Sequence, residues 1–429
     1  MEKHPEAKSG TFLIRQALIV DPGSSHHNRK ADIFIENGII TQIGDLNIAK
    51  AQVIDAENCI AMPGLFDLRC RQGEPGLEQN ETIESLINAA TQGGFTGLAV
   101  LPDTQPPVQS RSQIEFILGK SRNKSVSVYP LGATTQNLEG KDLAELYDMQ
   151  LGGAIGFSNA DHAYSAGSLQ RALLYSSSFN GLIFSHAEDL SLSNGGYVNE
   201  SNNTAALGLK PLPAHAEFTA IAVQIEIARY TNSRLHFSHI STSESVNLIR
   251  KAKSEGIAIT CDVSILHLIL NDTAVLEFDA NLKLMPPLRN ETDRLALIAG
   301  VNDGTIDCIV SDHNPQAPEH KVVEFNYAPF GASTIQLFTS LYFTYLKSVI
   351  NLETFWKSTV LNPRKILGLV QPQIEVGQVA GLFIFNPNLT WTFNRATNAS
   401  LSYNSHLFGA EIKGKTIFSI HQNQIFINS

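Results

Sequence analysis

Three side chains that can bind a metal ion or move a proton each follow a short apolar run. His186 follows GLIFS, His239 follows RLHFS and Asp312 follows DCIVS. Neutral imidazole and carboxylate are the usual ligands of a catalytic zinc ion, and a carboxylate beside a metal-bound water can act as its base. Any one of them alone would be an ordinary hydrogen-bonded residue. Three at equivalent places predict descent from a metal-dependent hydrolase, without deciding whether metal is bound.

Eight short apolar runs in the middle of the chain supply the strands that would position these side chains. Helix-period segments lie between most of them, such as 242–255, where Val246, Ile249 and Ala252 share one face. Strands that alternate with helices indicate parallel βα units, and eight units favour a closed (β/α)8 TIM barrel, whose chemistry lies at the carboxyl ends of its strands. A further helix is expected over 331–350. The apolar runs are 63–68, 96–101, 126–132, 153–157, 181–186, 234–239, 257–263 and 306–311.

Both ends of the chain are instead rich in β-branched residues broken by turn signals. TFLIRQALIV and ADIFIENGIITQIG lie near the start, and GLFIFNPN and LTWTF lie near the end. We expect residues 1–62 and 370–429 to pair as a small composite β-sandwich domain beside a barrel of residues 63–369. The alternative is two unrelated terminal extensions.

Composition excludes several classes of protein. The 429 residues include 31 Lys and Arg against 41 Asp and Glu, and no basic block occurs, so nucleic acid and membrane surfaces are poor partners. No apolar run reaches the roughly 18–20 residues of a membrane span, and the start, MEKHPEAKSG, lacks the apolar core of a secretion signal. The four cysteines form no CxxC motif, which is typical of reduced thiols. We expect a cytoplasmic protein, and a homo-oligomer because closed symmetric assemblies are common.

Longer runs resemble the dihydroorotases of the amidohydrolase superfamily. They are PGLFDLRCRQGEPG, ETIESLINAATQGGFTGLAVLPDTQP, SHAED, MPPLR, SDHNPQ and APFGAS, with ADIFIENGIITQIG and VGQVAGLFIFNPN resembling the flanking β domain. The resemblance covers nearly the whole chain in order. It implies an amidohydrolase-type barrel and the reversible hydrolysis of the dihydroorotate ring amide to carbamoyl aspartate, on one or two zinc ions.

Several positions depart from the family pattern. The family's His-x-His-x-Arg motif, two metal ligands and an arginine for the substrate carboxylate, corresponds here to Arg69, Arg71 and Gly73. The bridging carboxylated lysine or aspartate corresponds to Asn159, and a substrate-binding asparagine corresponds to Asp103. The resemblance retains His186, His239 and Asp312, the last as both metal ligand and general base. The other altered positions are Met285 for an asparagine, Leu266-His267 for a His-His pair and Gln316 for a histidine.

The two arginines oppose metal binding on physical grounds. Arg69 and Arg71 alternate along a strand, so both point toward the barrel centre. A guanidinium offers no lone pair to a metal and repels it, by about 4 kcal/mol at 4 Å and an effective dielectric near 20. We hypothesise that one of them pairs with Asp312 in place of the lost cation; otherwise both would face solvent, and they could also hold an anion.

Three functions follow from this pattern. The first is a dihydroorotase-like protein of pyrimidine biosynthesis without catalysis or metal, because family members lacking His-x-His serve as structural partners of aspartate transcarbamoylase. The second is an active cyclic amidohydrolase with one zinc on His186, His239 and Asp312, and with Asp161 or His162 as the missing acid. The third is a scaffold or binding protein outside pyrimidine synthesis, since fold alone does not fix function.

Overall fold

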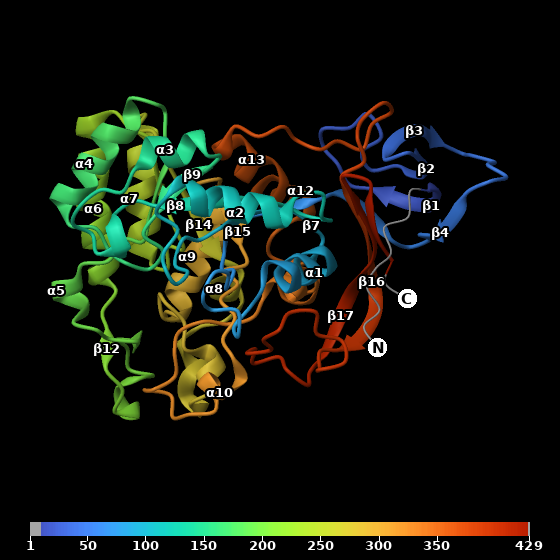
Figure 1. The fold of residues 1–429 in the computed structure, drawn as a ribbon. Coiled ribbons are helices and arrows are strands. Elements are labelled where there is room, and N and C mark those ends of the chain that lie inside the picture. The colour runs from blue at the N-terminus through green and yellow to red at the C-terminus, as the bar shows by residue number, and fades with distance from the viewer. Residues whose placement is uncertain (1–9, 428–429) are drawn as a thin grey trace.

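The computed structural model describes residues 10–427, and its larger part is a parallel barrel (Figure 1). Eight strands pair side by side in parallel in the order β15-β14-β13-β10-β9-β8-β7-β6, and a parallel bridge between Cys70 and His313 joins the two ends. All residues of β6 and β7 are buried, as expected for strands covered on both faces. The predicted (β/α)8 barrel is confirmed. Its strands are β6 (Leu65–Cys70), β7 (Phe95–Val100), β8 (Ser127–Ala133), β9 (Gly156–Ser158), β10 (Ile183–Ser185), β13 (Leu235–Phe237), β14 (Ile259–Ser264) and β15 (Cys308–Val310).

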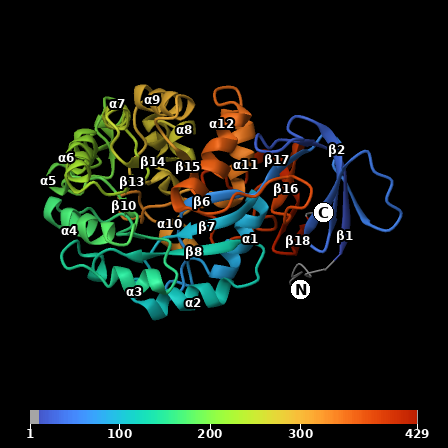
Figure 2. The ribbon, with the colours of Figure 1, turned by 90° about the horizontal axis from the view of Figure 1, so that it is seen from above.

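Helices surround these strands (Figure 2). Local sequence sets where they begin: the Thr82 side chain accepts a hydrogen bond from the Ser85 backbone in a capping box, and at the start of the predicted helix 242–255 the Thr242 side chain accepts one from the Ser245 backbone. The helices are α1 (Ile83–Gly93), α2 (Arg111–Ser121), α3 (Leu146–Leu151), α4 (Ala166–Ser177), α5 (Leu190–Ser193), α6 (His215–Thr231), α7 (Ser243–Ser254), α8 (Ile265–Ile269), α9 (Glu291–Asn302), α10 (Pro318–Lys321), α11 (Phe338–Leu341), α12 (Leu352–Trp356) and α13 (Asn362–Leu367).

The two terminal segments form one sheet together, which confirms the predicted composite β domain. Its order is β18-β17-β16-β5-β1-β2-β3, with β4 beside β1. The join is the antiparallel pairing of β5 with β16, in which Pro63 lies opposite Leu382. The strands are β1 (Thr11–Ile19), β2 (Lys30–Glu36), β3 (Ile39–Gly44), β4 (Gln52–Asp55), β5 (Ile60–Pro63), β16 (Leu382–Thr392), β17 (Glu411–His421) and β18 (Gln424–Ile427), while β11 (Val198–Asn199) and β12 (Pro211–Leu212) pair separately.

The prediction of one continuous helix over 331–350 is wrong. The chain there forms a 3-10 turn at Ile335–Leu337, the short α11 and a π-helical turn at Tyr342–Leu346. The Thr339 hydroxyl donates to the Gly93 carbonyl at the end of α1, which ties this irregular segment to the barrel. No helix within residues 10–427 has the length and apolar character that a membrane span requires.

Candidate functional site

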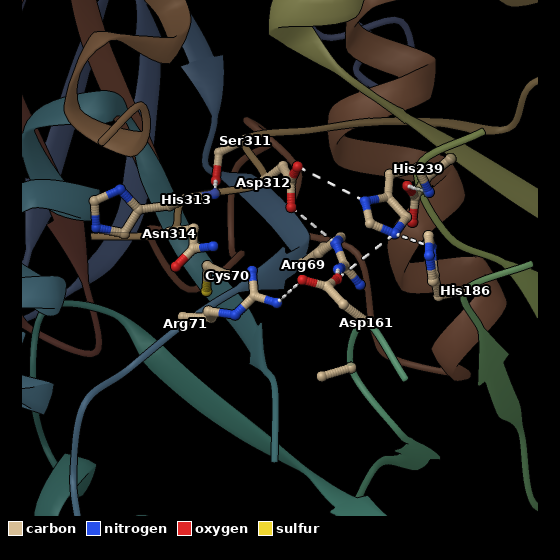
Figure 3. A network of polar contacts seen from close by, with 12 residues as sticks. Arg69, Cys70, Arg71, Asp161, His186, His239, Ser311, Asp312, His313 and Asn314 are labelled. Carbon is tan, nitrogen blue, oxygen red and sulfur yellow. Dashed lines mark hydrogen bonds and ion pairs between the residues drawn. The ribbon is translucent and has the colours of Figure 1, made fainter. Parts of the chain in front are cut away.

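Arg69 lies at the end of β6 and is almost fully buried at the mouth of the barrel. Its Nε donates to Asp312 Oδ1 at 2.8 Å, and its Nη2 donates to Asp161 Oδ1 (Figure 3). Burial alone would raise the pKa of Asp312, but the Arg69 guanidinium holds that pKa below its usual range. The hypothesis that an arginine pairs with Asp312 is therefore confirmed for Arg69.

Arg71 extends the same ion cluster toward solvent. Its Nε donates to Asp103 Oδ2 at 2.6 Å and its Nη2 donates to Asp161 Oδ2 at 2.5 Å. Asp161 thus accepts from both guanidiniums, one on each oxygen. Although burial favours its neutral form, Arg71 and Arg69 hold the pKa of Asp161 well below the usual range. We call Arg69, Arg71, Asp103, Asp161 and Asp312 the mouth cluster; it holds two cations and three anions.

The acid that bridges the two arginines is Asp161, one of the two residues proposed for the missing acid, and not the matched Asn159. Asn159, which the resemblance matches to the bridging ligand, turns instead to Thr135, accepting from its backbone N at 3.0 Å and donating to its Oγ1 at 2.8 Å. Ala160 then adopts a left-handed conformation with φ of 52° and redirects the chain. Asp161 therefore enters the mouth, while the neighbouring His162 is exposed and takes no part.

The two retained histidines contact each other beside the cluster. His186 Nδ1 lies 2.9 Å from His239 Nε2, and His186 Nε2 lies 2.9 Å from Glu188 Oε2. His239 Nδ1 lies 3.8 Å from Asp312 Oδ2. Burial, with Arg69 nearby, lowers the pKa of His239 to about 4, so this imidazole is neutral at pH 7.

These donors do not fit a zinc site in the arrangement observed. A His186 nitrogen and a His239 nitrogen are directed at each other, and Arg69 lies between the carboxylates of Asp161 and Asp312. Among residues 10–427, no three or more His, Cys, Asp and Glu side chains are grouped so that they could hold a metal ion.

The position of the family's substrate arginine has no room for a side chain. A Cβ on Gly73 would lie 2.2 Å from the backbone oxygens of both Leu77 and Glu81, so the loop after β6 would have to move. Asp103, at the family's asparagine position, is bonded to Arg71. Neither position therefore offers a free group to a substrate carboxylate.

The other altered positions are Met285, His267 and Gln316. Met285 is half-buried and brings no charged or hydrogen-bonding group. His267 is buried with its Nε2 3.0 Å from the Pro286 oxygen, and burial lowers its pKa. The Gln316 amide donates to Asn314 Oδ1 at 2.8 Å.

Asp67 lies below the cluster on the same strand. Its Oδ1 accepts from the backbone nitrogens of Arg69 and Ser311, and its Oδ2 accepts from the Ser311 hydroxyl. Burial raises its pKa to about 7 despite these bonds. Neutral donors thus stabilise Asp67, whereas the two guanidiniums of the mouth cluster pair with its three carboxylates.

Replacing Arg71 with alanine should destabilise the protein by about 2 kcal/mol, less than the loss of a fully buried ion-pair partner, because its side chain is 14% exposed. Asp103 would lose its cation, whereas Asp161 would keep Arg69. Thermal unfolding measures the effect. Lys141→Ala is the matched control, because Lys141 pairs with Glu139 at a site where it is 76% exposed. Equal melting temperatures for Arg71→Ala and the native chain would contradict the role of Arg71.

This chain is similar to proteins named dihydroorotase. A family model described as dihydro-orotase-like matches residues 59–245. A dihydroorotase of Pelotomaculum thermopropionicum is 39% identical over 408 residues, covering 94% of this chain and 95% of that protein. A dihydroorotase of Acetivibrio thermocellus is 35% identical over 421 residues, covering 97% and 99%.

Solved structures share the fold at lower identity. The L-hydantoinase (dihydropyrimidinase) of Arthrobacter aurescens superposes with a TM-score of 0.85 at 22% identity, covering 98% of this chain and 96% of that one. The dihydropyrimidinase of Brevibacillus agri gives 0.80 at 20% identity, with coverages of 97% and 95%. At these identities the likeness concerns the fold alone.

Proposed function

Because the chain belongs to the dihydroorotase family of the amidohydrolase superfamily, we propose that it is a dihydroorotase-like protein of pyrimidine biosynthesis that no longer hydrolyses dihydroorotate. We further propose that it serves as a structural partner of aspartate transcarbamoylase. The relatives named dihydroorotase support the pathway. The mouth cluster supports the loss of hydrolysis.

A single observation carries the proposal: Arg69 and Arg71 occupy the family's two metal-ligand positions, and their guanidiniums bind Asp161 and Asp312. Amide hydrolysis at neutral pH needs an activated water. Zinc lowers the pKa of its bound water to about 7, whereas an arginine neither binds a hydroxide in this way nor accepts its proton. Arg69 holds Asp312, the family's general base, in its ionised form, and without a metal ion Asp312 would have no activated water to deprotonate.

Loss of the substrate anchor supports the same proposal independently of the metal. The family arginine that holds the substrate carboxylate is Gly73 here, and the surrounding backbone leaves no space for a replacement. Asp103 and Asp161 also place negative charge in the same pocket wall as Gly73. An anionic substrate would therefore bind weakly even if a nucleophile were present.

An apolar surface on the outside of the barrel supports a protein partner. Exposed side chains include Tyr147 and Leu151 on α3, Tyr175 on α4, and Val223 and Tyr230 on α6, with Tyr230 73% exposed. A groove of about 550 Å³ lies between α4 and α6, and Figure 1 shows these helices at the opposite end of the molecule from the β sheet. Exposed apolar patches of this kind mark protein interaction sites.

The proposed loss of hydrolysis predicts close to zero zinc per chain and no detectable turnover of dihydroorotate. Elemental analysis of protein purified without chelator or an affinity metal column measures the first, and an assay for carbamoyl aspartate measures the second. About one tightly bound zinc per chain together with turnover would support a mononuclear cyclic amidohydrolase instead, and replacing His186 would then abolish both.

The proposed partnership predicts co-elution with aspartate transcarbamoylase from the same organism during size-exclusion chromatography. Tyr230→Glu should weaken co-elution if the partner covers the groove between α4 and α6. Tyr345→Glu is the control, since Tyr345 is 45% exposed and lies on the π-helical turn rather than on α4 or α6. Separate elution of the two native proteins would favour a role outside pyrimidine synthesis.

A further inference from the structure

A pocket of about 290 Å³ remains open beside the mouth cluster. Its wall includes Arg71, Gln72, Asp103, Asp161, Gln316 and Phe330. The pocket lies just below the range of about 300–1,000 Å³ that is usual for ligand sites, and its wall sets one aromatic ring, that of Phe330, among mostly polar groups. Its size suits a molecule of one ring.

The charge of the wall disfavours an anion. The two arginines are directed at carboxylates of the same cluster, and the cluster as a whole carries one more negative than positive charge. Arg71 bonds to Asp103 and Asp161 rather than standing free. The sequence left open that these arginines hold an anion; the observed pairing removes the free cation that such a site requires.

Gln72 is the unusual member of the wall. Its side chain is 4% exposed, and among the described residues neither its Nε2 nor its Oε1 has a hydrogen-bond partner. Leaving a buried donor or acceptor unpaired costs about 1–3 kcal/mol for each group. Both amide atoms are closed off from the pocket in the observed rotamer, so the amide gains a partner only by turning toward a molecule that offers one acceptor and one donor side by side.

We propose that this pocket binds a small planar molecule carrying an uncharged carboxamide. The Gln72 side chain turns from the wall to pair its N–H and its oxygen with the carboxamide, and Phe330 lies against the ring. The inference rests on the proposed function in one respect: the bound molecule is held and not hydrolysed.

Three pyridines that differ in one substituent test the charge and the amide together. Nicotinamide is neutral, nicotinate carries a carboxylate, and 3-aminomethylpyridine carries an ammonium group. Isothermal titration of the full chain at pH 7 should give nicotinamide a Kd at least tenfold below those of the other two. The inference is overturned if nicotinamide does not bind at about 20 mM or if either charged probe binds as tightly.

Variants locate the binding in the pocket. Gln72→Met keeps the side-chain volume and should weaken nicotinamide about tenfold, the loss expected when a paired hydrogen bond of about 1.4 kcal/mol is removed. The control Gln150→Met removes an amide that lies on α3 and donates to the Phe179 carbonyl, so its Kd should not change. Gln316→Met, at the pocket wall, replaces Gln72→Met if that variant does not melt cooperatively. An unchanged Kd in the pocket variant overturns the inference.

The same titration separates this inference from the proposed function. Recovery of nicotinate and ammonia from bound nicotinamide would contradict the absence of hydrolysis but leave the binding site in place. Absence of binding without hydrolysis would remove the binding site and leave the proposed function untouched.

Discussion

Replacing Arg69 with methionine is expected to lower the free energy of unfolding by about 3–5 kcal/mol, the cost of removing one partner from a buried ion pair. Methionine retains much of the side-chain volume, so the change isolates the charge. Asp161 would lose the donor on its Oδ1 and Asp312 would lose the 2.8 Å bond from Nε. Both carboxylates would then lie close together with only Arg71 as a cation nearby.

Chemical unfolding in guanidinium chloride measures this loss, and Arg111→Met is the control. Arg111 and Glu115 form an exposed pair one helical turn apart, so its removal should cost less than about 1 kcal/mol. A second change, Asp161→Asn, should recover part of the Arg69→Met loss because it removes one unpaired charge. Equal stability of Arg69→Met and the native chain would show that the arginine does not neutralise the mouth.

Acid should reduce the difference between the native chain and Arg69→Met. The guanidiniums lower the pKa of Asp161 in the folded state, so their contribution is present above the ordinary carboxyl value near 3.9 and is lost as pH falls below it. The two unfolding curves should therefore approach each other below about pH 4. A difference that grows in acid would have the wrong sign for this ion cluster.

The sequence predicts regular elements well where local signals agree. The expected helix at 242–255 matches α7 (Ser243–Ser254) closely, because the Thr242 cap marks its start and the apolar face of Val246, Ile249 and Ala252 marks its buried side. The segment 331–350 fails because it is buried on nearly all sides. Its apolar residues show no face, and its breaks are set by tertiary bonds such as Thr339 to Gly93.

The candidate site, too, could be predicted from the sequence only in part. The alternation of side chains along one strand predicted that Arg69 and Arg71 both point toward the barrel centre. One of them was expected to pair with Asp312, and Arg69 does so. The sequence offered Asp161 only as one of two residues for the missing acid, because the resemblance pointed to Asn159 and because a left-handed Ala160 decides which side chain enters the mouth. A backbone conformation of this kind in a non-glycine residue has no signal in the sequence.

The double variant R69H/R71H is expected to take up about one zinc per chain, against close to zero for the native chain. It removes both guanidiniums, so the repulsion of a divalent cation is lost, and it frees Asp161 and Asp312 from their ion pairs. Two imidazoles would then join His186, His239 and the freed carboxylates, and imidazole with carboxylate is a ligand set that zinc accepts. Elemental analysis after dialysis against zinc measures the change.

The control for that variant is R69M/R71M, which removes the same two charges but adds no ligand. If zinc uptake needs the imidazoles, only R69H/R71H binds the metal. If removal of the two charges is enough, both variants bind it. If neither variant binds zinc, the barrel mouth lacks the geometry of a zinc site. Turnover of dihydroorotate should stay low even with zinc present, because Gly73 cannot carry the missing anchor without moving Leu77 and Glu81. Metal binding without turnover would thus separate the two losses that the native sequence combines. Rapid hydrolysis of dihydroorotate by R69H/R71H would show instead that the two arginines alone prevent catalysis.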